Sequence, residues 1–203
     1  ASDSTFCQGS TVTFTDLSSG TPTSWAWDFG DGFSDTSQNP THIYNSPGTY
    51  DVSLIVSRIV SGNSEIDTIT KSNFITVNTI PTVSGGTNQA VCSGGSVTLT
   101  GSSTTNTNIT YTWDNGITDG NPFIPTSTTT YTLTGTDLNG CISLSTVDVS
   151  VNALPTVVAG TDQAVCQGSS VILNASGATN YSWDNGVLNG IDFIPTSTAT
   201  YSV

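Results

Sequence analysis

Apolar and polar residues alternate along much of this chain, with a period of two. The alternation is clearest in the segments 50–56, 109–113 and 147–151. Successive side chains of a β-strand point to opposite faces, so this period predicts strands with one buried and one exposed face. Such strands are typical of antiparallel sandwiches. Since helical periodicity is absent, we predict an all-β fold.

One short pattern occurs three times along the chain. A repeat of this length indicates an array of small domains rather than one large fold. We therefore predict domains over residues 1–79, 80–153 and 154–203. The copies begin at Cys7, Cys92 and Cys166, pass through Trp27-Asp28, Trp113-Asp114 and Trp183-Asp184, and reach Thr49-Tyr50, Thr130-Tyr131 and Thr200-Tyr201.

Two similar linkers join the predicted domains, at residues 77–83 and 151–157. Each contains a proline, Pro81 or Pro155, and the two prolines are 74 positions apart. Proline restricts the backbone, so we expect an extended string with limited hinge freedom.

The third copy of the pattern is shorter than the second. It ends three residues after Thr200, whereas the second copy continues through Cys141 and the predicted strand 147–151. We expect its sandwich to lack the last strands and to leave an unpaired edge. Either the polypeptide continues past Val203, which we favour, or another chain completes the sheet by strand addition.

Composition excludes several classes of partner. The net charge is -13, and the only basic residues besides one histidine are Arg58 and Lys71. Nucleic-acid binding needs many cations to displace counterions from phosphate, so we expect none. An anionic membrane surface is disfavoured for the same reason. No segment approaches the roughly 20 apolar residues of a membrane helix, and we expect no direct membrane insertion.

Repeated aromatic residues are the predicted core anchors. Each tryptophan of the Trp-Asp pairs recurs at one place in the pattern, which favours a buried anchor over a sugar-stacking platform. We also assign the tyrosines of the Thr-Tyr pairs to the core. The predicted core residues are Trp27, Trp113, Trp183, Tyr50, Tyr131 and Tyr201.

The four cysteines indicate disulfides and an oxidising compartment, because none forms a Cys-x-x-Cys motif and only one histidine is present. We predict a Cys92–Cys141 bridge that closes a loop of 49 positions, worth roughly 4 kcal/mol. Cys166 occupies the place of Cys92, and its partner would fall near position 211, beyond the chain. Cys7 is predicted to be free, or paired upstream or on another chain.

Four blocks of the first segment carry a family resemblance. In order, they are Val12-Thr13-Phe14-Thr15-Asp16, Trp25-Ala26-Trp27-Asp28-Phe29-Gly30-Asp31-Gly32, Asn39-Pro40-Thr41-His42-Ile43-Tyr44 and Pro47-Gly48-Thr49-Tyr50-Asp51-Val52. The segment resembles a PKD domain, a β-sandwich. Together with the resemblance of the second and third segments described next, this resemblance implies an all-β tandem array of Ig-like sandwiches, in which a PKD domain precedes two Ig-like domains and the last is incomplete.

The second and third segments resemble the Ig-like repeats that accompany PKD domains in giant surface proteins of Bacteroidetes. This resemblance implies a secreted or cell-surface protein exported by the type IX system. The residues that carry it are Gln89-Ala90-Val91-Cys92, Tyr111-Thr112-Trp113-Asp114-Asn115-Gly116, Phe123-Ile124-Pro125-Thr126-Ser127-Thr128 and Leu138-Asn139-Gly140-Cys141.

An acidic loop and one histidine are the candidate chemical sites of the first segment. Asp28, Asp31 and Asp35 could hold calcium, which prefers several oxygen ligands, but the PKD resemblance favours a turn that these side chains stabilise. His42 lies in a strand of the PKD pattern and lacks the nucleophile and acid that catalysis requires. We therefore predict no enzymatic activity. We also predict no cofactor, with calcium bound by the three aspartates as the alternative.

Two tripeptides, Asp3-Ser4-Thr5 and Asp67-Thr68-Ile69, resemble the O-glycosylation sequon of Bacteroidetes. The resemblance makes Ser4 and Thr68 candidate glycosylation sites.

Taken together, these features predict a non-catalytic spacer or stalk segment of a large extracellular bacterial protein that serves adhesion or surface assembly. Its partners would be neighbouring domains of the same chain, identical chains in a filament, or surface glycans. One alternative is a self-assembling filament or sheath subunit completed by strand donation. A second is an accessory module that presents substrate to a secreted hydrolase. A third is a lectin-like segment that binds through Phe33.

Overall fold

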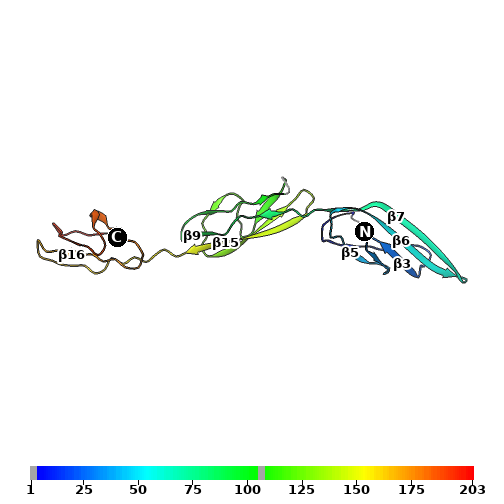
Figure 1. Cartoon of the computed structure of the whole chain (residues 1–203), viewed down its shortest axis with the longest axis horizontal. Helices are drawn as coiled ribbons and strands as arrows, with labels where there is room; N and C mark the ends of the chain where they lie inside the picture. The colour runs from blue at the N-terminus through cyan, green and yellow to red at the C-terminus, as the bar shows by residue number, and fades with distance from the viewer. Residues whose placement is uncertain (1–3, 105–107) are drawn as a thin grey trace.

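A computed structural model describes residues 4–104 and 108–203 of the chain. The described residues contain β-strands and one short 3-10 turn, so the predicted all-β class is confirmed. The sheets fall into three successive units along the chain, and the units lie in a line (Figure 1). We call them the first unit (residues 4–78), the second unit (79–152) and the third unit (153–203). No helix of the described residues is long and apolar enough to cross a membrane.

The first unit packs two sheets against each other. Its larger sheet has the order β1-β7-β6-β3-β4, and its smaller sheet pairs β2 with β5. The first strand, β1, runs parallel to the last strand, β7, whereas the other pairs are antiparallel. The strands are β1 (Thr5–Cys7), β2 (Thr11–Thr13), β3 (Ser24–Asp28), β4 (Ser34–Asp35), β5 (Thr41–Ile43), β6 (Gly48–Val60) and β7 (Asn63–Asn78).

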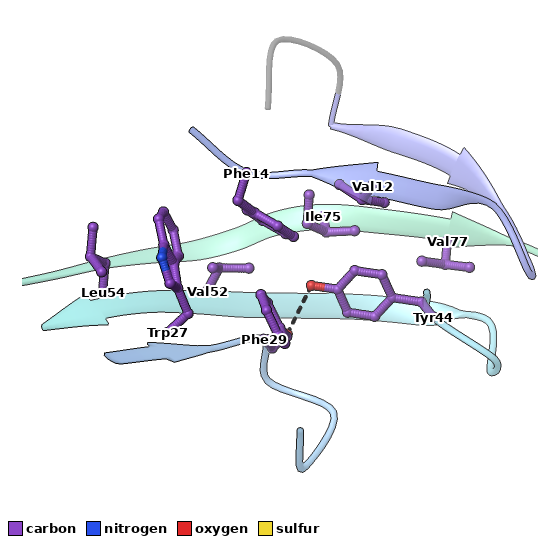
Figure 2. Packing of buried hydrophobic residues seen from close by; sticks show 9 residues of the cluster. All are labelled: Val12, Phe14, Trp27, Phe29, Tyr44, Val52, Leu54, Ile75 and Val77. Carbon is purple, nitrogen blue, oxygen red and sulfur yellow. Dashed lines mark hydrogen bonds between the residues drawn. The ribbon is translucent and has the colours of Figure 1, made fainter. Parts of the chain in front are cut away.

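Alternating residues of these strands form the core of the first unit (Figure 2). Trp27 is buried as predicted, and its indole N–H donates to the Ser37 carbonyl. The most deeply buried tyrosine is Tyr44, which is 1% exposed and donates to the Phe29 carbonyl at 3.0 Å (Figure 2). Burial, followed by the charge of Asp31, raises the pKa of Tyr44 well above its usual value.

Tyr50 was predicted as a core residue, but it is only half-buried. It lies beside a register shift between β6 and β7, and its hydroxyl donates to the Ser46 carbonyl. Tyr50 keeps the inward-facing parity of Val52 and Leu54 and packs against the edge of the core. The fully buried ring beside it is that of Tyr44, with 4.6 Å between the two ring centroids.

The hairpin of β6 and β7 extends beyond the sandwich, at the end farthest from the second unit (Figure 1). Its turn, Ser61-Gly62, has positive φ at both residues, 51° and 83°. Such a turn matches the twist of paired strands, and glycine adopts it without strain. The projecting strands place apolar side chains such as Ile59 and Ile66 in solvent.

The second unit repeats this design with a four-stranded sheet of order β12-β14-β15-β9. Again the first long strand, β9, runs parallel to the last strand, β15. Trp113 and Tyr131 are buried in the core, as predicted. The strands are β8 (Val83–Ser84), β9 (Gln89–Cys92), β10 (Val97–Thr98), β11 (Ser102–Ser103), β12 (Thr110–Trp113), β13 (Pro122–Phe123), β14 (Thr129–Thr136) and β15 (Ile142–Asn152).

The third unit keeps part of the second unit's geometry. It contains β16 (Val171–Ile172), a 3-10 turn (Asp184–Gly186) and β17 (Asp192–Phe193), and a bridge joins Val158 to Ser176. The Trp183 indole donates to the Asn189 side chain, just as the Trp113 indole donates to Asp119. Trp183 is buried as predicted.

No counterpart of the four-stranded sheet forms among residues 153–203. That sheet is centred on β14 and β15, and the third unit ends where its counterpart of β14 has begun. Tyr201, predicted as a core residue, is therefore only half-buried. It still packs edge-to-face on Phe193, as Tyr131 packs on Phe123.

A carboxylate fixes the start of the loop that follows β2. Asp16 accepts hydrogen bonds from the Ser18 backbone, the Trp25 indole and the Gln38 amide at 2.8, 2.8 and 3.2 Å. Burial alone would raise the pKa of Asp16, but these hydrogen bonds outweigh it and lower the pKa to about 2.

This lowered pKa predicts a pH-dependent effect of Asp16→Asn. The charged carboxylate stabilises the first unit above the unfolded-state pKa of about 3.9, and this contribution is lost as the pH falls towards 2. We expect the variant to lose about 1 kcal/mol of unfolding free energy at pH 7 and almost nothing at pH 2. Urea unfolding at both pH values measures the difference.

Asp67→Asn is the matched control, because it removes the same charge from an exposed site on β7. An equal loss for Asp16→Asn at both pH values would contradict the prediction.

Candidate functional site at the joint between the first two units

A disulfide bond crosses the joint between the first and second units. It links Cys7 to Cys141, two residues 134 positions apart, with 5.6 Å between their Cα atoms. The predicted Cys92–Cys141 bridge is therefore wrong, and so is the prediction that Cys7 is free or paired outside this chain. Cys92 and Cys166 are exposed and carry no disulfide in the structure.

Parallel strand pairing places Cys7 at the joint. Cys7 ends β1 and lies opposite Asn78, the last residue of β7. The chain then turns away, because the Gln8 N–H donates to the Asn78 carbonyl and the Ser10 N–H donates to the Cys7 carbonyl. Residue 7 thus lies where the first unit ends, although it is near the beginning of the chain.

The hairpin loop between β14 and β15 places Cys141 on the other side of the joint. Asp137 organises this loop, since its carboxylate accepts from the backbone N–H groups of Asn139 and Cys141 at 2.9 and 2.8 Å. Gly140 has a φ of 79°, a conformation that glycine adopts easily. Cys141 is 0% exposed, so the bond is sealed from solvent on this side.

The length of β15 explains why Cys92 cannot reach Cys141. Cys92 lies opposite Asn152 at the end of β15, and Cys141 immediately precedes its start at Ile142. A strand of 11 residues spans about 35 Å, whereas a disulfide needs Cα atoms within about 7 Å. The two cysteines lie at opposite ends of the second unit. Recognising from the sequence that the strand ending in Cys92 pairs in parallel with the last strand would have revealed this.

The three aspartates of the acidic loop stabilise turns. The carboxylates of Asp28, Asp31 and Asp35 accept backbone hydrogen bonds from Gly30, Phe33 and Ser37, respectively. Each bond reaches two residues ahead, the geometry of an Asx turn. These aspartates do not gather into a cluster, and the described residues contain no group of three or more potential metal ligands.

His42 is held by packing and by one carboxylate. Its Nε2 lies 2.8 Å from the Asp31 carboxylate, and its ring stacks on Phe29 with 4.2 Å between centroids. Tyr44 contacts it edge-on. The imidazole thus fixes the acidic loop to β5, which is a structural role.

An open groove of about 680 Å³ lies beside the projecting hairpin of the first unit. Exposed aliphatic side chains line it, among them Leu17, Ile66 and Ile69. The groove is also lined by the chain's one arginine and one lysine, Arg58 and Lys71. Arg58 pairs with Glu65 and donates to the Gly20 carbonyl, while the Lys71 ammonium lies 4.6 Å from the centre of the Phe74 ring.

The candidate modification and sugar-binding residues are exposed. Ser4 precedes β1, and Thr68 lies on the projecting part of β7. Phe33, the aromatic considered for glycan stacking, is 62% exposed next to His42. Glycosylation of Ser4 and Thr68 and glycan binding remain predictions.

Comparison with known proteins supports part of the family resemblance. The family model "PKD domain" matches residues 1–74, which is less than half of the chain. A segment of 33 residues is 54% identical to a collagenase, ColA, of Bacillus cereus. That segment is 16% of this chain and 3% of the collagenase. A PKD domain and a disulfide are both typical of extracellular proteins.

The chain also matches solved structures, including the following three. A carbohydrate-binding module of the β-sandwich superfamily is 26% identical, with a TM-score of 0.31 over 66% of this chain and 51% of its own. Titin domains I67–I69 are 13% identical, with a TM-score of 0.35 over 90% and 76%. The insect immune protein hemolin is also 13% identical, with a TM-score of 0.35 over 74% and 45%.

The disulfide predicts which thiols react. Alkylation of the unreduced 203-residue chain should modify Cys92 and Cys166 and leave Cys7 and Cys141 unmodified, because the latter are bonded to each other. Peptide mapping by mass spectrometry should recover one linked pair that contains Cys7 and Cys141. Reduced protein is the control and should take up four alkyl groups. A linked pair of Cys92 and Cys141 would refute the assignment.

Proposed function

We propose that this chain is a non-catalytic spacer segment of a larger extracellular bacterial protein that serves adhesion or surface assembly. The observation that carries the proposal is the Cys7–Cys141 bond across the joint between two β units. Display outside the cell agrees with this bond, with the PKD match and with a surface rich in uncharged polar residues. Type IX export is part of the same proposal.

A spacer must keep its units in line, and the joint has two features that restrict bending. Residues 79–82 connect β7 to β8, and Pro81 limits their backbone freedom. The disulfide adds a second covalent connection beside this linker, because Cys7 lies next to Asn78 on one side and Cys141 lies in a hairpin loop on the other. Two connections side by side oppose both rotation and separation of the units.

The same bond changes how the segment responds to tension. Force applied at the two ends reaches Cys7 after six residues and passes directly to Cys141. The residues between the two cysteines, which include nearly all of the first unit, therefore bear no force along the backbone. We propose that this route of force through the disulfide protects the residues between Cys7 and Cys141 from mechanical unfolding.

Stretching single molecules by their ends tests the spacer function. We expect reduction of the disulfide to lengthen the fully extended protein by roughly 480 Å, because it releases 134 positions at about 3.6 Å each. Optical tweezers measure this length with and without a reductant.

Two variants control the stretching experiment. Cys7→Ala with Cys141→Ala should show the longer extension without reductant, whereas Cys92→Ala should keep the shorter one. Equal extension of the oxidised and reduced protein would contradict the proposal.

The groove of the first unit favours a second candidate function, an accessory module that holds a polymeric substrate for a hydrolase. Its exposed aliphatic lining suits the side chains of an extended polypeptide, since sugar rings instead stack on exposed aromatic faces. The match of a short segment to a collagenase points in the same direction. We therefore take a polypeptide as the substrate in this second candidate.

Co-sedimentation with insoluble collagen and with insoluble cellulose tests the second candidate. We expect retention on collagen alone, reduced about tenfold by Leu17→Ser with Ile66→Ser, because two apolar contacts are lost. The control is Ile59→Ser, which removes an exposed side chain outside the groove. Equal retention of the groove variant and the control would rule out this use of the groove.

A further inference from the structure

Cys92 has the same local structure as Cys7. Each residue ends a strand that runs parallel to the last strand of its unit, opposite Asn152 and Asn78, respectively. The residue after each cysteine donates its N–H to the carbonyl of that asparagine, at 2.8 and 2.9 Å. Cys92 therefore lies where the second unit ends, just as Cys7 lies where the first unit ends.

The linker that follows the second unit also matches the linker that follows the first unit. Residues 152–157, Asn-Ala-Leu-Pro-Thr-Val, correspond to residues 78–83, Asn-Thr-Ile-Pro-Thr-Val. The third unit then retains contacts of the second. The Gln163 amide donates to the Ile172 carbonyl as Gln89 donates to Thr98, and the Gly190 N–H donates to Leu173 as Gly120 donates to Leu99. The second joint thus begins with the same parts as the first.

The thiol that would complete the second joint belongs to a hairpin of the third repeat. In the second unit, that hairpin turns after β14 and presents Cys141. Tyr201 corresponds to Tyr131, an offset of 70, so the corresponding cysteine would occupy position 211 of a complete third repeat. Cys166 is not the expected partner, because it occupies the place of Cys92 in the third repeat, and the pattern predicts it at the far end of that unit.

We propose that Cys92 forms a second disulfide across the next joint, with a hairpin thiol of the completed third repeat. Exposure of Cys92 alone would not support this bond. The Cys7–Cys141 disulfide supports it, because Cys7 occupies the equivalent position one unit earlier and is bonded to a cysteine of the next unit's hairpin loop. The inference extends the proposed spacer function from one joint to a series of joints.

The bond forms by thiol–disulfide exchange. The Cys92 thiolate attacks a disulfide oxidant, RSSR, and gives a mixed disulfide and one RS⁻, which takes up the proton that Cys92 released. The hairpin thiolate then attacks the Cys92 sulfur, displaces the second RS⁻ and closes the protein bond. Two protein thiols are oxidised and RSSR is reduced to two RSH, so protons and electrons balance.

Disulfide mapping of the full-length protein from its source gives the first test. We expect the peptide that contains Cys92 to be linked to a peptide from the hairpin of the third repeat. Alkylation of Cys92 without reduction would overturn the proposal. A bond from Cys92 to Cys166, or to Cys92 of a second chain, would also overturn it.

A designed extension gives the second test. Residues 134–152 of the second unit are added after Val203, which corresponds to Leu133, so that the copied cysteine falls at position 211. We expect one reactive thiol, Cys166, in the unreduced protein. The matched control carries serine at the copied cysteine and should show two reactive thiols.

Three reactive thiols in the extended chain would overturn the proposal. The proposed spacer function would be unaffected by that result, because its own test is the release of length on reduction of Cys7–Cys141. The two experiments can therefore fail independently.

Discussion

The parallel pairing of an early strand, β1 or β9, with the last strand determines the architecture of each of the first two units. It places β1 beside the end of β7 and β9 beside the end of β15. As a result, a residue near the start of each repeat lies where that unit meets the next one. The positions of Cys7 and Cys92, and the covalent joint that Cys7 forms, depend on this pairing.

Much of the fold could be predicted from the sequence. The alternation of apolar and polar residues identifies strands locally, and a tryptophan that recurs at one place in each repeat identifies a core position. Trp27, Trp113 and Trp183 lie in the core, where the repeated pattern placed them. Two of the three tyrosines are only half-buried, for different physical reasons. Tyr50 lies near the start of β6, where its hydroxyl donates to the exposed Ser46 carbonyl, and Tyr201 lacks the neighbouring strand that covers Tyr131.

The candidate site could not be predicted in the same way, because a disulfide depends on which strands pair and in which direction. Sequence spacing favoured Cys92–Cys141, since both residues belong to one repeat. Pairing direction places them at opposite ends of β15 and brings Cys7 to the joint instead. The turns of the acidic loop, by contrast, agree with the interpretation that the sequence favoured, because each aspartate accepts from the backbone N–H two residues ahead.

The bond between the first two units also changes what a protease can do to this molecule. A cut at any single peptide bond between Cys7 and Cys141 leaves both fragments attached to each other through sulfur. That range includes the exposed turn Ser61-Gly62 at the tip of the projecting hairpin, the kind of site where proteases cut most readily. Along about two thirds of its backbone, from Cys7 to Cys141, the segment can therefore be nicked without releasing whatever lies at either end.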